Sequence, residues 1–286
     1  ENHSLKPYKQ RVLGTYIFLE QALKLLASET ESLRKATKTD QNRRSDKQVV
    51  AWDLDMRNPD KMDFAGIEYV KAKDPLLNLE YIKWLGKAKT YKDLPVLWAR
   101  QPKTTVKVAK NYWLPAQFLT VIERLDIHGV QYETIKKPVS ISATQLTAGE
   151  TKFQDKPFEG HQVPATTFTE KLNTVVMPAG SFKIPSDQPL GSLVVALLDP
   201  RAPDSFFSWG FFNQMFQRTE YIESYAMIPL AHQMIENEPA LENEFLAKKK
   251  SDEKFASDQR LQMSWFYERS KYYDQHYLKY PILLEH

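Results

Sequence analysis

Short gaps between strand-like runs constrain the fold of this chain most strongly. Between residues 49 and 110, runs rich in Val, Ile and aromatic residues alternate with turn signals such as Asn58-Pro59 and Asp74-Pro75. The gaps are too short for helical crossovers, so at least some of about four or five strands must pair antiparallel. Residues 130–185 contain further strand-like runs at a spacing of roughly 8–12 residues, which indicates a sandwich or a barrel-like meander.

A helical pattern precedes this β-rich middle. After Pro7, apolar residues recur in steps of three and four from Val12 to Leu26. This spacing predicts an amphipathic helix that continues to about Lys38. Residues 37–48 contain no apolar side chain and predict a solvated linker.

Helices are also expected inside and after the β-rich part. One is predicted over residues 111–129, with Pro115 near its start and Gly129 beyond its end, and a short one over Leu190–Leu198, capped by the preceding Asp187. The last third, 204–283, has helical spacing and many aromatic residues, and Leu261, Trp265 and Phe266 share one helix face. We expect this tail to pack on the β-rich part, because so many aromatic side chains would not remain in water. The predicted fold class is α+β: a leading helix, a β-rich antiparallel, sandwich-like middle and a helical, aromatic-rich C-terminal tail.

Composition excludes several kinds of function. The chain has 286 residues, of which 42% are hydrophobic and 26% charged, as in a globular protein with a real core. A net charge of +3 is too small to argue for nucleic acid or an anionic membrane as a partner. The absence of cysteine excludes disulfides, thiolate metal sites and a Cys nucleophile. No apolar run reaches transmembrane length.

Three groups of residues are candidates for a site, and each has a structural alternative. His232 and Glu236 are spaced i, i+4 on a predicted helix, but two ligands without a third do not make a metal site, so we favour a surface hydrogen bond. Glu159-Gly160-His161 lies between strands, where Gly beside polar residues is typical of a turn. The aromatic block 206–216 could be a platform for sugars or bases, yet no basic stripe surrounds it and buried core is the better interpretation.

The first residues carry a resemblance to a known family. ENHSLKPYKQRVLGTYIFLEQAL resembles the closing segment of a zinc metallocarboxypeptidase of the carboxypeptidase A type, in particular of large bacterial members with a long C-terminal extension. In that family a strand delivers a catalytic Glu to the zinc-bound water, and a final helix packs back on the sheet. The resemblance implies that Glu1 is this catalytic Glu and that Tyr8–Leu26 is the final helix. YWLPAQFLTVIERLDIHG and LLDPRAPDSFFSWGFF are similar to the extension.

The same resemblance implies an organisation and a role. Residues 1–38 would close the carboxypeptidase-like domain, and residues 49–283 would be its extension. The family's zinc ligands, an H-x-x-E pair and a later His, have no counterpart in the sequence, nor has its substrate-carboxylate Arg. We therefore expect an accessory region that is inactive alone and holds no metal, with zinc and the peptide substrate bound by an upstream catalytic domain of the same protein. The parent would be periplasmic or secreted.

Two further expectations concern an alternative role and the chain ends. The alternative is a self-sufficient β-rich module that binds peptide or carbohydrate on a sheet face. A contiguous exposed aromatic patch would favour the module, whereas wholly buried aromatics would favour the accessory role. A helix so soon after a bare Glu indicates a piece of a longer protein. The terminal Leu284-Glu285-His286 resembles the start of a purification tag, for which we expect no part in the fold.

Overall fold

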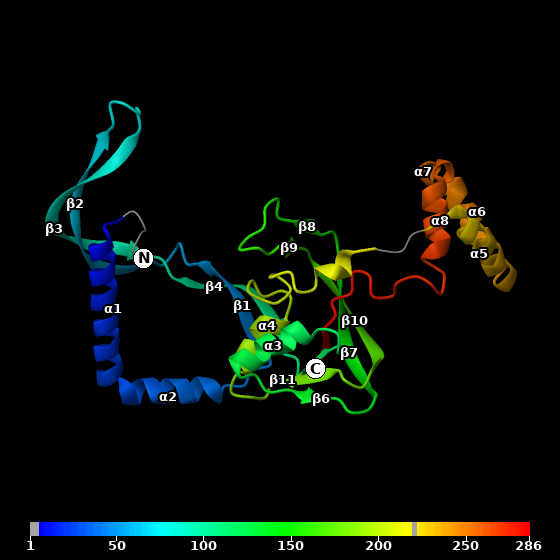
Figure 1. Cartoon of the computed structure of the whole chain (residues 1–286), viewed down its shortest axis with the longest axis horizontal. Coiled ribbons are helices and arrows are strands. Elements are labelled where there is room, and N and C mark those ends of the chain that lie inside the picture. Colours follow the sequence, from blue (N-terminus) through cyan, green and yellow to red (C-terminus); the bar gives the residue numbers. More distant parts are fainter. Residues whose placement is uncertain (1–5, 219–221) are drawn as a thin grey trace. The chain divides into compact units, whose positions relative to one another are not determined.

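The chain folds into two compact units (Figure 1). The computed structural model describes residues 6–218 and 222–286. Antiparallel sheets and a helical C-terminal part confirm the predicted α+β class. The units divide the chain elsewhere than between residues 38 and 49, so that domain boundary stays a prediction. The first unit comprises Glu1–Ala109 and Pro185–Ser205, and the second comprises Lys110–Ile184 and Phe206–His286.

The leading helix is interrupted within its predicted length. α1 spans Tyr8–Ser28 and α2 spans Thr30–Gln41, with Glu29 between them at φ −105° and ψ 17°. The hydroxyl of Thr30 donates to the carbonyl of Leu26 at 2.7 Å. Such side-chain bonds to the preceding turn bend helices, because they compete with the backbone pattern. The break therefore follows from polar residues at the junction.

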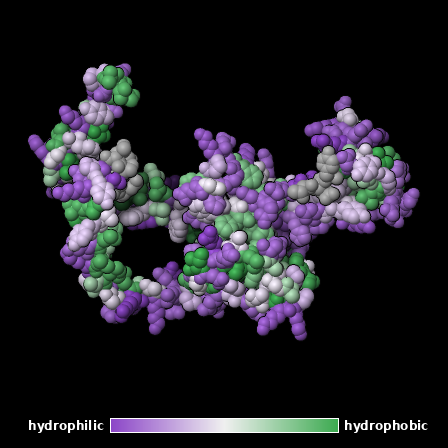
Figure 2. All heavy atoms as spheres, in the orientation of Figure 1, coloured by the Kyte–Doolittle hydropathy of each residue, from purple (hydrophilic) through white to green (hydrophobic). Residues whose placement is uncertain are grey.

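Neither of these helices buries a residue. The apolar side chains of α1 from Val12 to Leu26 are exposed, and Phe18 is 71% exposed (Figure 2). Residues 37–47 are exposed as predicted, but 37–41 belong to α2 rather than to a linker. None of the described helices is long and apolar enough to span a bilayer.

The first unit also contains a two-stranded sheet, against which a short helix packs. β1 (Lys47–Leu54) pairs antiparallel with β4 (Ala99–Lys107), and α4 (Gly191–Leu198) lies against β1. The side-chain amide of Gln48 donates to the carbonyl of Ser192 at 2.9 Å. This bond joins two segments that are far apart in the sequence.

The predicted short helix is confirmed as α4, but its start differs from the expectation. Asp187 does not cap the helix; it accepts from Arg44 Nε at 2.6 Å instead. A Cβ at Gly191 would lie 2.0 Å from the carbonyl oxygen of Ser186. Only glycine allows this close approach, so backbone packing and not a side-chain cap sets the start of α4.

The other two strands of the first unit form a long hairpin. β2 (Asp60–Lys73) pairs antiparallel with β3 (Glu80–Val96), and at 14 and 17 residues both exceed the short strands predicted. The ring of Tyr69 stacks on Tyr91 at 6.1 Å and meets Trp84 edge to face at 5.7 Å. Cross-strand aromatic pairs of this kind stabilise a ribbon that has no second sheet to pack on.

Six strands of the second unit form one sheet in the order β10-β7-β12-β5-β11-β6. The order is not that of the meander suggested by strand spacing, because the last strand of the chain enters between β7 and β5. β8 (Lys152–Phe153) and β9 (Pro164–Ala165) form a separate short hairpin. The six strands are β5 (Asn111–Leu114), β6 (Glu133–Thr134), β7 (Val139–Ala148), β10 (Phe168–Met177), β11 (Phe182–Pro185) and β12 (Leu283–Glu285).

The expectation that the terminal residues take no part in the fold is wrong, because Leu284 and Glu285 belong to β12. Leu284 is buried and pairs with Tyr112 across the ladder. The carboxylate of Glu285 accepts from Asn111 Nδ2 and from Trp113 Nε1, both at 2.8 Å. A strand with both backbone and side-chain partners is part of the fold.

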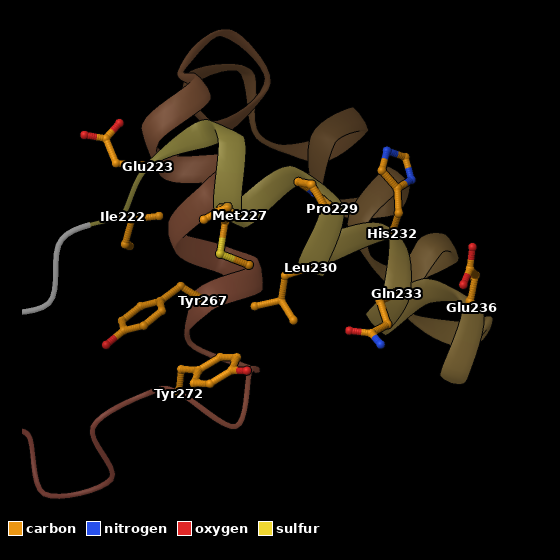
Figure 3. A pocket seen from close by; sticks show the side chains of 11 residues that line it. Ile222, Glu223, Met227, Pro229, Leu230, His232, Gln233, Glu236, Tyr267 and Tyr272 are labelled. Atoms are coloured by element: carbon orange, nitrogen blue, oxygen red, sulfur yellow. The ribbon is translucent and has the colours of Figure 1, made fainter.

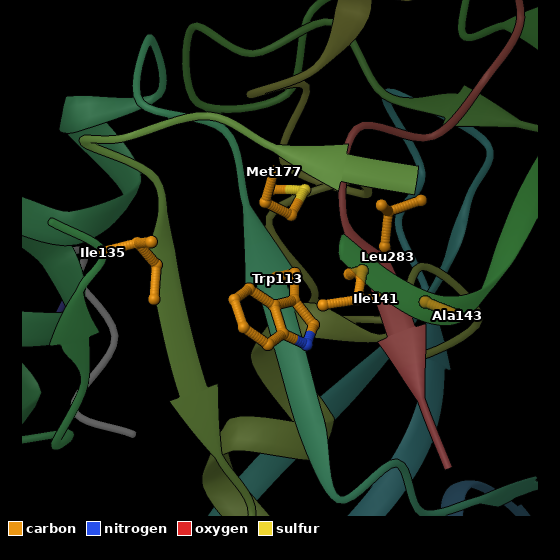
Figure 4. Packing of buried hydrophobic residues seen from close by; sticks show 6 residues of the cluster. All are labelled: Trp113, Ile135, Ile141, Ala143, Met177 and Leu283. Atoms are coloured by element: carbon orange, nitrogen blue, oxygen red, sulfur yellow. The ribbon is translucent and has the colours of Figure 1, made fainter. Parts of the chain in front are cut away.

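Both faces of this sheet contribute to the core. Phe207 and Phe212 of the aromatic block pack around the buried ring of Tyr280, with ring centroids 5.9 and 5.2 Å away. This confirms that the block 206–216 is largely core. A second cluster (Figure 4) consists of Trp113, Ile135, Ile141, Ala143, Met177 and Leu283.

The helix predicted over 111–129 is shorter than expected. Residues 111–114 form β5, Pro115 follows it, and α3 spans Leu119–His128. Residues 111–114 pair with β12, and this strand pairing outweighs the helical spacing of their side chains. The end is as predicted, with Gly129 at φ 75°, and the buried stripe includes Val121, Ile122 and Leu125.

The helical part has its own core. The buried residues of the helices contact one another. The predicted packing of the tail's aromatics on the β-rich part is found for Phe207 and Tyr280, whose rings meet that of Phe168 in β10, and for the helices it stays a prediction. Leu261 is exposed, whereas Trp265 and Phe266 are buried. The helices are α5 (Ser224–Asn237), α6 (Ala240–Ser251), α7 (Glu253–Ser257) and α8 (Gln259–Tyr267).

Trp265→Ala should destabilise this helical core by about 3–5 kcal/mol, the range for removing a large buried aromatic side chain. Trp265 is 6% exposed, packs on Phe266 at 4.9 Å, and carries the Arg269 guanidinium 3.8 Å above its ring. Urea unfolding followed by circular dichroism measures the change. Leu246→Ala, at an exposed position of α6, is the matched control and should stay within about 0.5 kcal/mol. Equal effects of the two substitutions would contradict the core assignment.

Candidate functional site

The predicted catalytic residue, Glu1, lies outside the described residues. The helix that follows it in the sequence is described, and it has no buried residue of its own. The segment that resembles the closing helix of a carboxypeptidase is thus present as a helix, with its apolar face uncovered (Figure 2).

A cavity of about 780 Å³ in the helical part contains the predicted pair His232 and Glu236. The side chains of Met227, Tyr267 and Tyr272 gather at one end of it (Figure 3). His232 and Glu236 stand on successive turns of α5 at the other end. The i, i+4 spacing places both side chains on one face of α5, as predicted, and that face lines the cavity.

The pair forms no recognisable catalytic or metal centre. Within residues 6–218 and 222–286, no group of three or more His, Asp or Glu side chains could hold a metal ion. The hydrogen bond that we favoured for His232 and Glu236 is not formed either. An imidazole and a carboxylate without a nucleophile or third ligand can orient a polar group of a ligand, while the tyrosine end contacts its apolar part.

Arg218 is the second notable group of this region, and the sequence did not indicate it. Its guanidinium lies over the rings of Tyr267, Tyr273 and Tyr277, at 5.8, 5.8 and 5.2 Å, and 3.7 Å from the Glu268 carboxylate. Burial raises the pKa of Tyr273, and the positive charge of Arg218 opposes that rise. The tyrosines thus hold the protein's own cation, which makes this cluster a structural contact.

Glu159-Gly160-His161 is a turn, as predicted. Phe158 and His161 exchange backbone hydrogen bonds of 2.9 and 2.8 Å. Glu159 and Gly160 between them have φ of 47° and 81°, which is the geometry of a two-residue hairpin turn. His161 packs edge to face on Trp209 at 5.3 Å. The ring of His161 thus packs against an aromatic side chain of the block 206–216.

The β2–β3 hairpin presents a surface that is not among the predicted sites. Phe64, Tyr69 and Trp84 form an exposed aromatic row on it, with Tyr91 partly covered between them. Hydrophobic residues also gather at the end of the hairpin (Figure 2). The signal was in the sequence, because apolar residues follow the turn signal Asp74-Pro75 directly, where polar residues are usual.

Comparison with known proteins supports a carboxypeptidase-related region in the chain. The chain is similar to two proteins named Carboxypeptidase 2, from the fungi Trichophyton tonsurans and Trichophyton equinum. Each is 28% identical over 103 residues, which is 35% of this chain and 19% of the relative. The match thus spans about a fifth of the length of these curated relatives. No protein-family profile and no solved structure matches the chain.

The purified chain should bind no stoichiometric zinc, since His232 and Glu236 lack a third ligand. Elemental analysis after dialysis against zinc at low micromolar concentration tests this. One tightly held zinc per chain, lost in His232→Ala and kept in His161→Ala, would contradict the prediction and identify the α5 pair as ligands.

Proposed function

We propose that this chain is the C-terminal accessory region of a bacterial zinc carboxypeptidase-like peptidase, and that α1 is the closing helix of the catalytic domain. The observation that carries the proposal is the uncovered apolar face of α1. The similarity of 103 residues of the chain to two carboxypeptidases supports the class of the parent protein.

The exposure of α1 requires a partner on physical grounds. An isolated helix of 21 residues is marginal in water and draws most of its stability from packing an amphipathic face. Ten large apolar residues of α1, from Tyr8 to Leu26, are exposed. A catalytic domain that precedes α1 in the same protein would cover this face, as the final helix of the resembled family packs on its sheet.

The chemistry of the parent would lie in that domain. When bound there, zinc would lower the pKa of a water molecule and polarise the peptide carbonyl. The residues described in this chain do not fit a zinc ion, since no three-ligand group exists among them. We therefore assign them no hydrolytic step. Glu1 alone would act, by moving a proton from the attacking water to the leaving amine.

The aromatic row on the β2–β3 hairpin favours a second candidate function, a binding face for peptide or carbohydrate. It is the exposed patch that this alternative requires. The rings also have a structural role, since Tyr91 lies across Gly66 and its hydroxyl donates to the carbonyl of Ile67 at 3.0 Å. The accessory role explains both α1 and the similarity to carboxypeptidases, so it remains the primary proposal.

Glu1→Gln in the parent protein should abolish peptidase activity while zinc remains bound. Gln keeps the size of Glu but cannot accept the proton, and a general base contributes about 10²–10⁴-fold to the rate. Hydrolysis of a C-terminal peptide bond and the zinc content are measured together. Glu20→Gln, which removes an exposed carboxylate paired with Lys24 on α1, is the matched control and should keep full activity. Full activity of Glu1→Gln would refute the assigned role.

A further inference from the structure

The end of the β2–β3 hairpin is an apolar tip that the described residues leave exposed. Leu76, Leu77 and Leu79 are 88%, 66% and 62% exposed. Single exposed apolar residues are ordinary, but three in one loop form a contiguous apolar surface. The hydrophobic end of the hairpin in Figure 2 is this loop.

Three backbone amides of the loop have partners within the loop. The Asp74 carboxylate accepts from the amides of Leu76 and Leu77 at 3.0 and 2.7 Å. The amide of Asn78 donates to the carbonyl of Asp74 at 2.9 Å, and Pro75 has no amide hydrogen. Entering an apolar medium is unfavourable mainly where amides lose their water without a replacement partner. The amides of Leu76, Leu77 and Asn78 can therefore leave water with their hydrogen bonds already made.

Charged and aromatic residues surround the tip in an order that suits a lipid interface. Lys71, Lys73 and Lys83 are exposed and form no ion pair with the described residues. Tyr81 and Trp84 follow the tip along β3 and are about half exposed. Aromatic rings of this kind favour the boundary between headgroups and acyl chains, and lysines favour anionic headgroups.

Side-chain hydrogen bonds join the base of the β2–β3 hairpin to the neighbouring strand β4. Arg100 of β4 donates to both carboxylate oxygens of Asp60 of β2, at 3.0 and 2.5 Å. These bonds to Arg100 hold the pKa of Asp60 below its ordinary value. The pair therefore stays charged at neutral pH.

From these observations we infer that the β2–β3 tip binds the surface of an anionic lipid bilayer, with Leu76, Leu77 and Leu79 at the acyl boundary. The net charge of +3 gave no reason to expect a membrane partner, because it averages over a local arrangement. A second copy of the tip fits less well, since it would bring the same lysines together. The inference is independent of the carboxypeptidase proposal.

Co-flotation of the full chain with lipid vesicles tests the inference. The chain should float with vesicles of phosphatidylcholine and phosphatidylserine in equal parts, more weakly with phosphatidylcholine alone, and less as salt is added. The triple variant Leu76→Ser, Leu77→Ser, Leu79→Ser should lower the partition coefficient by roughly tenfold or more. It should fold normally, because these side chains contact no core.

Two control variants make the result specific. Leu119→Ser, Leu172→Ser, Val176→Ser removes three comparably exposed apolar residues from the second unit and should bind like the unaltered chain. Leu13→Ser, Ile17→Ser reduces the apolar face of α1 and should keep the dependence on the tip leucines. No flotation, equal losses in tip and control variants, or loss only in the α1 variant would overturn the inference. Self-association that requires the tip leucines, without vesicle binding, would also overturn it in favour of a second copy.

Discussion

The second unit depends on a strand formed by the last residues of the chain. β12 lies between β7 and β5 in the strand order and pairs with both. It therefore joins the β10-β7 part of the sheet to the β5-β11-β6 part. Leu283 and Leu284 point to opposite faces and are both buried. Without this strand, the hydrogen-bonding edges of β5 and β7 and both core clusters would be open to water.

This constraint explains how the helical part is built. The chain leaves the sheet after the aromatic block, forms α5 to α8, and must return so that Tyr280 and β12 can complete the core. The helices are therefore an insertion between two segments that belong to the core of the sheet. Their buried cluster is self-contained, because aromatic residues such as Phe245 and Trp265 pack on each other, 5.5 Å apart. In the first unit, the described residues leave the apolar side chains of α1 and of the β2–β3 hairpin exposed, and the two proposals above assign partners to them.

Local sequence patterns predicted many of the helices and turns. The predictions that failed concern segments whose structure depends on pairing with distant residues. The stripe of α3, the glycine that ends it, the turn at Glu159-Gly160 and the core role of Trp265 all depend on short-range spacing. The helix predicted to include 111–114 failed because the partner of that segment lies at the other end of the chain. The ring contacts of Tyr69 with Trp84 and Tyr91 could not be predicted from spacing, since the strand register and its bulges bring these rings together. The shared helix face of His232 and Glu236 follows from their spacing, but the cavity that this face lines depends on residues from α8 and the segment after it, which spacing does not reveal.

The central claim is that α1 is stabilised by a domain that precedes it in the parent protein. Amide hydrogen exchange tests it directly, because exchange reports local opening. In this chain alone, α1 amides should exchange nearly as fast as those of an unprotected peptide, while β7 amides are strongly protected. In the parent protein, α1 should gain protection comparable to that of β7. Protection of α1 in this chain alone, equal to that of β7, would contradict the claim.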